Sequence, residues 1–446
     1  MADLIDLCRA ALSSAKDDEP AEAFAAETRR TQVKARAADV ESLSASETRG
    51  VGLRTVIGGR LGYAWSADPS MDDAVELLAA ARANAALATS DEANELPVAS
   101  PAEDLPWLFR PALAELGTER KVRLALDLEK AAISSDPAVE RVEEVMYGDA
   151  ISRVAIASTA GVSGGYSRTD CWCMVSALAE RDGETQSGFS FRVAREADEL
   201  EWQECASEAA VRGARLLGAT KPETGRLPVV LDPWAAAGFL GVLAGALSAE
   251  ERQKGRSLLA DLVNQEVASP EVTLVDDGRL PQGPASSPID DEGVPTTRTV
   301  LVEGGTLRGF LHNTVTARRD GGASTGNASR PSYRGVPGVS PSNLLLAPGP
   351  ENPEAVLARA GRAVYVQDLT GLHSGANPVS GEFSVGATGL RIDGGALGEP
   401  LREMTIASTL LDVLKQVVAV GSDLRFYGGS IGSPTILIGE MTVAGR

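Results

Sequence analysis

The chain carries, at residues 227–251, the stretch LPVVLDPWAAAGFLGVLAGALSAEE, which predicts a short buried strand that runs directly into a helix. The strand is an apolar, β-branched run that stops at Asp232. Asp232 is a favoured helix N-cap, and Pro233 then takes the first helical position, where a backbone N–H would have no partner anyway. Because residues 234–249 carry no charge, we expect a buried helix at the start of a new domain.

The predicted helix has two different sides. Its large apolar side chains fall on one face: Phe239, Leu240, Leu243 and Leu247. A bare seam, on which another backbone can lie close, is formed by three glycines: Gly238, Gly241 and Gly245. A zinc-hydrolase helix carries His-Glu at its middle and another His about one turn later, whereas this helix carries no metal ligand of any kind.

Composition limits both the fold and the partners. A length of 446 residues allows two or three domains, and 43% hydrophobic content with 46 glycines indicates a folded chain with many turns. The chain has 42 basic and 62 acidic residues, so its net charge is −20. This charge argues against nucleic acid and against anionic membrane surfaces as partners.

The sequence predicts a cytoplasmic protein. Its first residues, MADLIDLC, lack the basic segment and apolar core of a secretory signal, and no uncharged run is long and apolar enough for a membrane span. Few and unevenly spaced cysteines favour a reducing compartment over a disulfide framework: Cys8, Cys171, Cys173 and Cys205.

The order of helical and strand-like segments predicts a multi-domain α+β fold. We expect an N-terminal α/β domain at residues 1–106, in which an antiparallel meander lies between two helices. A central α+β domain follows at residues 107–224. The C-terminal domain, residues 225–446, is expected to be mostly strands with turns rich in Gly, Pro and Ser.

Further helices and turns are expected at particular positions. Helices in the second and third domains are predicted at four ranges: 115–135, 197–217, 353–362 and 406–420. Glycine pairs are interpreted as turns, most of them in hairpins: Gly58-Gly59, Gly164-Gly165, Gly304-Gly305, Gly321-Gly322 and Gly394-Gly395.

No local pattern in the sequence predicts a metal site or a catalytic residue. The only histidines are His312 and His373, and neither has a second ligand at helical spacing. Cys171 and Cys173 fall on a predicted strand, where both thiols face the same way. We interpret these residues as partly buried histidines and strand cysteines.

Two polar segments of the third domain are the candidates for substrate binding. Asp290, Asp291 and Glu292 form a carboxylate cluster, a type of site that can bind a hard cation or perform acid–base chemistry, although a solvated turn is the commoner explanation of such a cluster. A later loop, rich in hydrogen-bonding side chains, suits an extended peptide held by main-chain bonding. The predicted substrate-binding residues are Asp290, Glu292, Ser324, Thr325, Gly326, Asn327, Arg330 and Asn343.

Read together, several phrases resemble those of the TldD/PmbA (TldE) family, whose members are modulators of DNA gyrase and peptide-maturing metalloproteases. The resemblance covers nearly the whole chain and rests on an ordered set of motifs: SPIDDEGVP from Ser287, LVEGGTLRGFLH from Leu301, STGN from Ser324, SGEFSVGATG from Ser380 and PTILIGEMTVAG from Pro434. VGLR from Val51 and AAVRGARLLGA from Ala209 extend it into the first two domains.

The resemblance implies a subunit without its own zinc. The catalytic TldD type carries His-Glu-x-x-x-His on the helix quoted first, and those three ligand positions fall here on Gly241, Val242 and Ala246. A cysteine in a late Gly-x-Cys-Gly loop is also missing, because the loop reads GSIGS from Gly429. This chain therefore looks like the TldE/PmbA type: no cofactor of its own, zinc and general base in a TldD-like partner, and an unstructured peptide as substrate.

Two rival hypotheses stay open at the level of sequence. One is a stand-alone homodimer that binds peptides without any peptidase attached. The other is an enzyme of unrelated chemistry that uses Asp290, Asp291 and Glu292, although no recognisable nucleophile or positioned base accompanies them.

Overall fold

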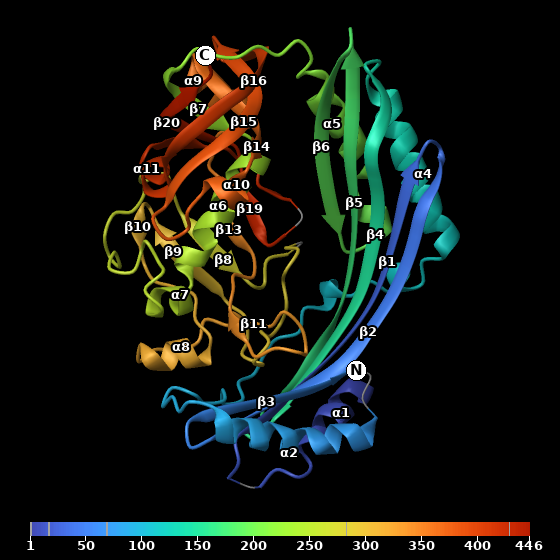
Figure 1. Ribbon diagram of the computed structural model, residues 1–446, viewed down its shortest axis with the longest axis vertical. Helices are drawn as coiled ribbons and strands as arrows, with labels where there is room; N and C mark the ends of the chain where they lie inside the picture. Colours follow the sequence, from blue (N-terminus) through green and yellow to red (C-terminus); the bar gives the residue numbers. More distant parts are fainter. Residues whose placement is uncertain (1, 17, 68–69, 282, 428) are drawn as a thin grey trace.

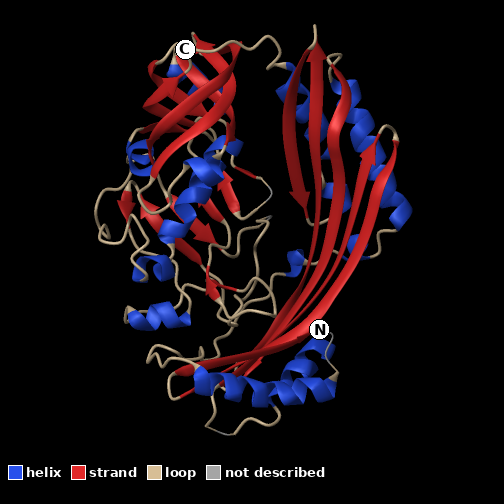
Figure 2. Cartoon of the chain, viewed as in Figure 1, coloured by secondary structure: helices blue, strands red, loops and turns tan. Residues whose placement is uncertain are grey.

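A computed structural model describes residues 2–16, 18–67, 70–281, 283–427 and 429–446, and it confirms the multi-domain α+β class (Figure 1). One long curved sheet runs along one side of the molecule, and the C-terminal half of the chain lies on its inner side (Figures 1 and 2). No helix in the described ranges has the length and apolarity needed to cross a bilayer.

The long sheet is antiparallel and has the strand order β3-β2-β1-β4-β5-β6. Its strands are β1 (Ala21–Arg36), β2 (Asp39–Ile57), β3 (Arg60–Ala67), β4 (Val139–Ser158), β5 (Ser163–Arg181) and β6 (Glu184–Ala194). β1 pairs with β4 from Glu22–Ser158 to Ala35–Val145. Because β1 and β4 belong to different predicted domains, the first two domains share one continuous sheet.

Helices cover the outer face of this sheet. They are α1 (Ala2–Leu12), α2 (Met71–Leu87), α3 (Pro111–Ala114), α4 (Thr118–Ser135) and α5 (Trp202–Ala214), with short 3-10 turns at Pro106–Leu108 and Ala197–Glu199. Strand residues alternate between faces, so Cys171, Cys173 and Val175 of β5 pack against the helices and Trp172 faces inward. All four cysteines are buried and free, as expected of strand and helix cysteines.

Two smaller sheets form the C-terminal half, with the orders β10-β9-β8-β13-β19-β18 and β16-β15-β14-β7-β20-β17. The strands are β7 (Gly225–Leu231), β8 (Leu274–Asp277), β9 (Arg298–Glu303), β10 (Thr306–Leu307), β13 (Leu344–Leu346), β14 (Ala363–Thr370), β15 (Glu382–Asp393), β16 (Ala396–Thr409), β17 (Val417–Val420), β18 (Arg425–Phe426), β19 (Ile431–Ser433) and β20 (Ile436–Ala444). A separate pair is formed by β11 (Ala328–Ser329) and β12 (Gly338–Val339).

The strand and helix predicted at residues 227–251 are confirmed. β7 lies inside its sheet, and helix α6 (Pro233–Ala244) follows it, with a short 3-10 turn at Gly245–Leu247. The Asp232 carboxylate accepts a 2.8 Å hydrogen bond from the Trp234 N–H, which is the expected N-cap. Phe239, Leu243 and Leu247 are buried in the core between the two smaller sheets.

The glycine seam of α6 is open. A Cβ added at Gly241 or Gly245 would meet no heavy atom within 4 Å, and at Gly238 it would meet only the side chain of Leu372, at 2.9 Å. No described backbone of this chain therefore lies along the seam. The seam faces away from the core that holds the other side of the helix.

Short helices complete the C-terminal half: α7 (Ala249–Gln253), α8 (Thr314–Arg319), α9 (Pro353–Ala360), α10 (Leu372–Gly375) and α11 (Leu410–Lys415). The helix predicted at 406–420 was wrong at both ends, because β16 continues to Thr409 and β17 begins at Val417. Thr409 ends the strand and caps α11, since its hydroxyl accepts a 3.1 Å hydrogen bond from the Asp412 N–H.

Three other local predictions need correction. The helix expected at 197–217 begins only at Trp202, because Leu200 adopts an extended conformation and is buried. Gly164-Gly165 lies inside β5 rather than in a turn. Gly321-Gly322 follows the end of α8 and joins no hairpin, and the left-handed φ of Gly321, 69°, is the kind that glycine allows after a helix.

Candidate functional site

Helix α6 and the loop before β19 form the part of the fold that the resemblance aligns with a zinc site. Gly241 is exposed, Val242 is partly buried against the apolar core, and Ala246 is buried. None of these three side chains carries an atom that can bind a metal. The residues therefore do not fit a zinc ion, and in the described ranges no cluster of three or more His, Cys, Asp and Glu is placed to hold one.

Neither histidine belongs to helix α6. His312 is partly buried, and its Nε2 lies 3.8 Å from Asp320 Oδ2. Burial is the main cause that lowers the pKa of His312, so the ring stays neutral near neutral pH. His373 belongs to the short helix α10 and is exposed, so the expectation of a partly buried side chain was wrong for this residue. Its neighbour Leu372 lies against Gly238 of α6.

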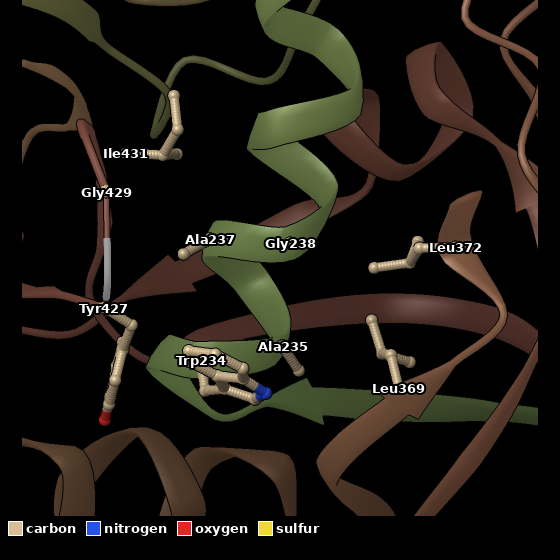
Figure 3. A pocket seen from close by; sticks show the side chains of 9 residues that line it. All are labelled: Trp234, Ala235, Ala237, Gly238, Leu369, Leu372, Tyr427, Gly429 and Ile431. Carbon is tan, nitrogen blue, oxygen red and sulfur yellow. The ribbon is translucent and has the colours of Figure 1, made fainter. Parts of the chain in front are cut away.

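An apolar cavity of about 240 Å³, which we call the helix pocket, lies at the start of α6 (Figure 3). Leu369 and Leu372 lie on one side of the helix, and Tyr427 and Ile431 lie on the other. Trp234 packs against the rings of Tyr427 and of Phe189 from β6, with centroids 5.1 and 5.0 Å away. The lining residues are Trp234, Ala235, Ala237, Gly238, Leu369, Leu372, Tyr427, Gly429 and Ile431.

The predicted carboxylates Asp290 and Glu292 are buried and bonded to backbone. Asp290 accepts hydrogen bonds from the N–H groups of Glu292, Val294 and Ala328, at 2.9, 2.9 and 3.0 Å. Burial, and then the nearby charge of Glu292, raises the pKa of Asp290 well above its usual range. Glu292 accepts a 2.9 Å hydrogen bond from the Thr314 N–H at the start of α8.

A buried network of ion pairs joins this loop to the long sheet. Arg54 of β2 donates two hydrogen bonds to Glu22 of β1, at 2.9 and 2.7 Å, and lies 3.0 Å from Glu292. Arg330 also pairs with Glu22. The two arginines balance the two glutamates, and all four side chains are at most 3% exposed. A buried charge that loses its partner costs several kcal/mol of folding free energy. The network therefore favours the one position of the C-terminal half in which all four side chains are paired.

Asn327 and Asn343 make similar internal contacts. Asn327 donates a 2.6 Å hydrogen bond to Asp276, and burial raises the pKa of Asp276 to about 7. Asn343 donates to the carbonyl of Asp277 at 2.6 Å and to the Ser286 hydroxyl at 3.0 Å. Both amides therefore hold neighbouring loops in place.

The remaining predicted residues surround His312. The hydroxyls of Ser324 and Thr325 each donate to its carbonyl at 3.1 Å. Gly326 has a left-handed φ of 74°, and an added Cβ would lie 2.5 Å from the Pro295 carbonyl oxygen. The structure thus gives the eight predicted residues contacts within the chain, and of these eight only Ser324 and Thr325 are partly exposed. Their contact with substrate stays a prediction.

A second cavity, of about 470 Å³, was not predicted from the sequence. We call it the sheet pocket. It lies between the inner face of the long sheet and the loops at 284–285 and 429–430. One local signal pointed to it, because Arg168, Asp170 and Trp172 alternate along β5 and share a face. The lining residues are Thr28, Arg30, Ala150, Ser152, Arg168, Asp170, Trp172, Phe191, Val193, Pro284, Ala285, Gly429 and Ser430.

Three models of one protein family match this chain, one after another along the sequence. The models for PmbA/TldA metallopeptidase domain 1, central domain and C-terminal domain match residues 21–85, 111–217 and 224–445. The fold is thus that of a metallopeptidase-type protein built from these three domains. The chain belongs to the PmbA/TldD metallopeptidase family.

Individual relatives span almost the whole chain. Metalloprotease PmbA of Escherichia coli O157:H7 is 27% identical, over 98% of this chain and 94% of that protein. A metalloprotease TldD homologue of Buchnera aphidicola subsp. Schizaphis graminum is also 27% identical, over 89% and 86%.

Solved structures show the same fold. A Thermotoga maritima protein described as a candidate modulator of a DNA gyrase superimposes with a TM-score of 0.91 at 26% identity, covering 99% of this chain and 100% of that one. TldE of Thermococcus kodakarensis gives a TM-score of 0.89 at 23% identity, covering 96% and 97%, which is a likeness of fold.

Proposed function

We propose that this chain is the non-catalytic, TldE/PmbA-like subunit of a cytoplasmic zinc metallopeptidase that processes or degrades unstructured peptides. A TldD-like partner carries the zinc and the general base in this heterodimer. The chain completes the cavity in which the partner cuts the peptide.

One observation carries the proposal. The framework around α6 matches the family, yet Gly241, Val242 and Ala246 offer no metal donor, and the helix is open at Gly241. A zinc hydrolase needs protein ligands, an open coordination position and a base. Positioning an extended peptide needs only pockets and polar loops, which this chain retains.

The two subunits are proposed to have different roles in the reaction. The partner polarises the scissile carbonyl and activates water. This chain excludes bulk water from one side of the cavity and offers apolar surface, including Trp234 and Tyr427 of the helix pocket, to the peptide.

The test is reconstitution from purified proteins. We expect the chain and its TldD-like partner to co-elute and to cleave an unstructured peptide, with cleavage abolished by a chelator and restored by zinc. Robust zinc-dependent cleavage by the lone chain would end the proposal. A stable self-dimer that binds peptide and ignores the partner would support the stand-alone peptide-binding hypothesis instead.

A further inference from the structure

The inner face of the long sheet is divided into a covered part and an open part. Near its α1 and α2 end, Phe24 and Ile156 are buried against Ile289 and Tyr333 of the C-terminal half. Farther along the same face, the described residues of the C-terminal half that line the sheet pocket belong to two short segments, 284–285 and 429–430. The residues on the sheet side of this pocket are therefore accessible to a ligand.

The ring of Trp172 lines the sheet pocket and packs on the backbone of the neighbouring strand. Trp172 of β5 stands opposite Gly148 of β4 in the strand register. A Cβ added at Gly148 would lie 2.3 Å from the indole ring. The ring thus rests directly on the β4 backbone, which only glycine permits at this position.

Arg30 of β1 lies over this ring. Its guanidinium carbon is 4.7 Å from the centroid of the Trp172 ring, which is a cation–π contact. Along the same strand Arg29 pairs with Glu47 at 3.3 Å and Arg36 pairs with Glu41 at 3.4 Å. Among the described residues Arg30 forms no ion pair, so an exposed positive charge is held in place by an aromatic ring.

Together with Arg30, the charged side chains beside it have a positive sum. Asp170 accepts a 2.9 Å hydrogen bond from Arg168 and also pairs with Arg195, which is buried. Arg195 donates further to the carbonyls of Gly283 and Pro284 and is thereby fully engaged. The charge of Asp291 also acts on Arg168, so three guanidinium groups, those of Arg30, Arg168 and Arg195, face two carboxylates and leave the pocket with a net positive charge.

This local charge opposes the charge of the whole chain. The net charge of −20 repels anionic ligands at long range, and only a short-range cluster of guanidinium groups reverses that repulsion. Arginine is also the residue whose planar fork matches a carboxylate. Phe191 and Val193 of β6 supply apolar surface beside the cluster.

We propose that the sheet pocket binds a carboxylate of an unstructured peptide, either an Asp or Glu side chain or the C-terminal carboxylate, through Arg30 and Arg168. The Trp172 ring and Phe191 contact the adjoining apolar part of the peptide. This inference rests on the proposed function, since that function makes the ligand a peptide. It assigns the subunit a preference for acidic segments.

The test measures binding of short peptides of Gly, Ser and Leu, labelled with an uncharged dye that has no carboxylate, to the full-length chain by fluorescence anisotropy. One peptide has an internal Glu and an amidated C-terminus, a second has a free C-terminal carboxylate and no Glu, a third has neither, and a fourth has Lys in place of Glu. We expect either carboxylate peptide to bind at least about tenfold more tightly than the neutral and Lys peptides, the effect of one charge-assisted hydrogen bond. The first two peptides distinguish a side chain from a C-terminus.

Two variants and a matched control assign the effect to the pocket. Arg30→Gln and Arg168→Gln are each expected to abolish the tenfold preference for the carboxylate peptides. Arg29→Gln removes the same charge from the next residue of β1, whose side chain lies on the opposite face of the sheet, and is expected to leave the preference intact. A thermal melt of each variant confirms that it is folded.

The outcomes separate this inference from the proposed function. Equal binding of all four peptides, no binding at all, or an equal loss in Arg29→Gln would overturn the inference, even if the chain and its partner cleave peptides together. A carboxylate preference that depends on Arg30, in a chain that never supports cleavage by a TldD-like partner, would uphold the inference and remove the proposed function.

Discussion

Arg54 on strand β2 and Glu292 in the loop before β9 form a buried ion pair between two distant parts of the chain. Their side-chain atoms lie 3.0 Å apart, at an angle that leaves Glu292 Oε1 without a hydrogen bond. Both hydrogen bonds of Arg54 go to Glu22. The contribution of Glu292 to Arg54 is therefore mainly the attraction between opposite charges. The pair is one of the buried polar links between the C-terminal half and the long sheet, and the pair of Arg330 with Glu22 is another.

Removing this charge should destabilise the protein. Glu292→Gln keeps the shape of the side chain but leaves two buried arginines facing one glutamate, and we expect a loss of about 3 kcal/mol, seen as a lower urea midpoint. Glu303→Gln is the control, because Glu303 pairs with Arg308 at 3.0 Å on the surface and should show no measurable change. Equal midpoints for the two variants would contradict a role for the buried network.

The stability of the protein should fall as pH rises from about 4 to about 7, in part through Asp276. Burial raises the pKa of this carboxyl from 3.8 to about 7, so the folded state holds a proton that the unfolded state has lost across this range. The contribution of Asp276 is fully present below pH 3.8 and is lost as pH rises through about 7. Urea midpoints across this range should fall less steeply for Asp276→Asn, and identical slopes would show that Asp276 does not titrate there.

Gly326 should tolerate no side chain. Both Gly326 and Gly321 adopt a left-handed φ, 74° and 69°, but only an alanine at 326 would place its Cβ 2.5 Å from the Pro295 carbonyl oxygen. Gly321→Ala is expected to cost about 1 kcal/mol, the price of the backbone conformation alone. Gly326→Ala should cost clearly more in the same denaturation measurement, and equal losses would mean that the close contact is relieved by a small shift of the loop.

Filling the open seam of α6 should lower peptide cleavage by the complex without lowering the stability of the lone chain. Gly241→Leu fills open space, so the melting temperature of the chain should not fall, and replacing a helical glycine tends to stabilise by about 0.5 to 1 kcal/mol. If the seam faces the shared cavity, the same change should lower peptide cleavage by the reconstituted pair. Ser134→Leu, which also places a leucine on an exposed helix surface, that of α4, is the control and should leave cleavage unchanged.

Local signals in the sequence predicted the strand and helix at 227–251, because an N-cap, a proline and an uncharged run act over neighbouring residues. The pairing of β1 with β4 was not predictable in the same way, since two strands, three α-helices and a long linker separate them in sequence. The error at α11 came from apolar spacing at residues 406–420 that fits a helix, whereas tertiary pairing with β15 and β20 extends β16 to Thr409.

For the candidate site, too, local sequence signals identified residues but not their long-range contacts. Polar residues from Asp290 to Asn343 were found because they stand in recognisable motifs, but Glu292 and Arg330 are buried against Arg54 and Glu22, which are far away in sequence. The sheet pocket combines Arg30, Trp172 and a late loop, and no short-range pattern brings these three together.

The most direct test of the central claim, that this chain relies on a partner for its metal, is the zinc content of the purified proteins by elemental mass spectrometry. The account predicts no bound zinc in the lone chain after dialysis and one zinc per complex with a TldD-like partner. A stoichiometric zinc ion retained by the lone chain would contradict it, whichever residues hold the ion.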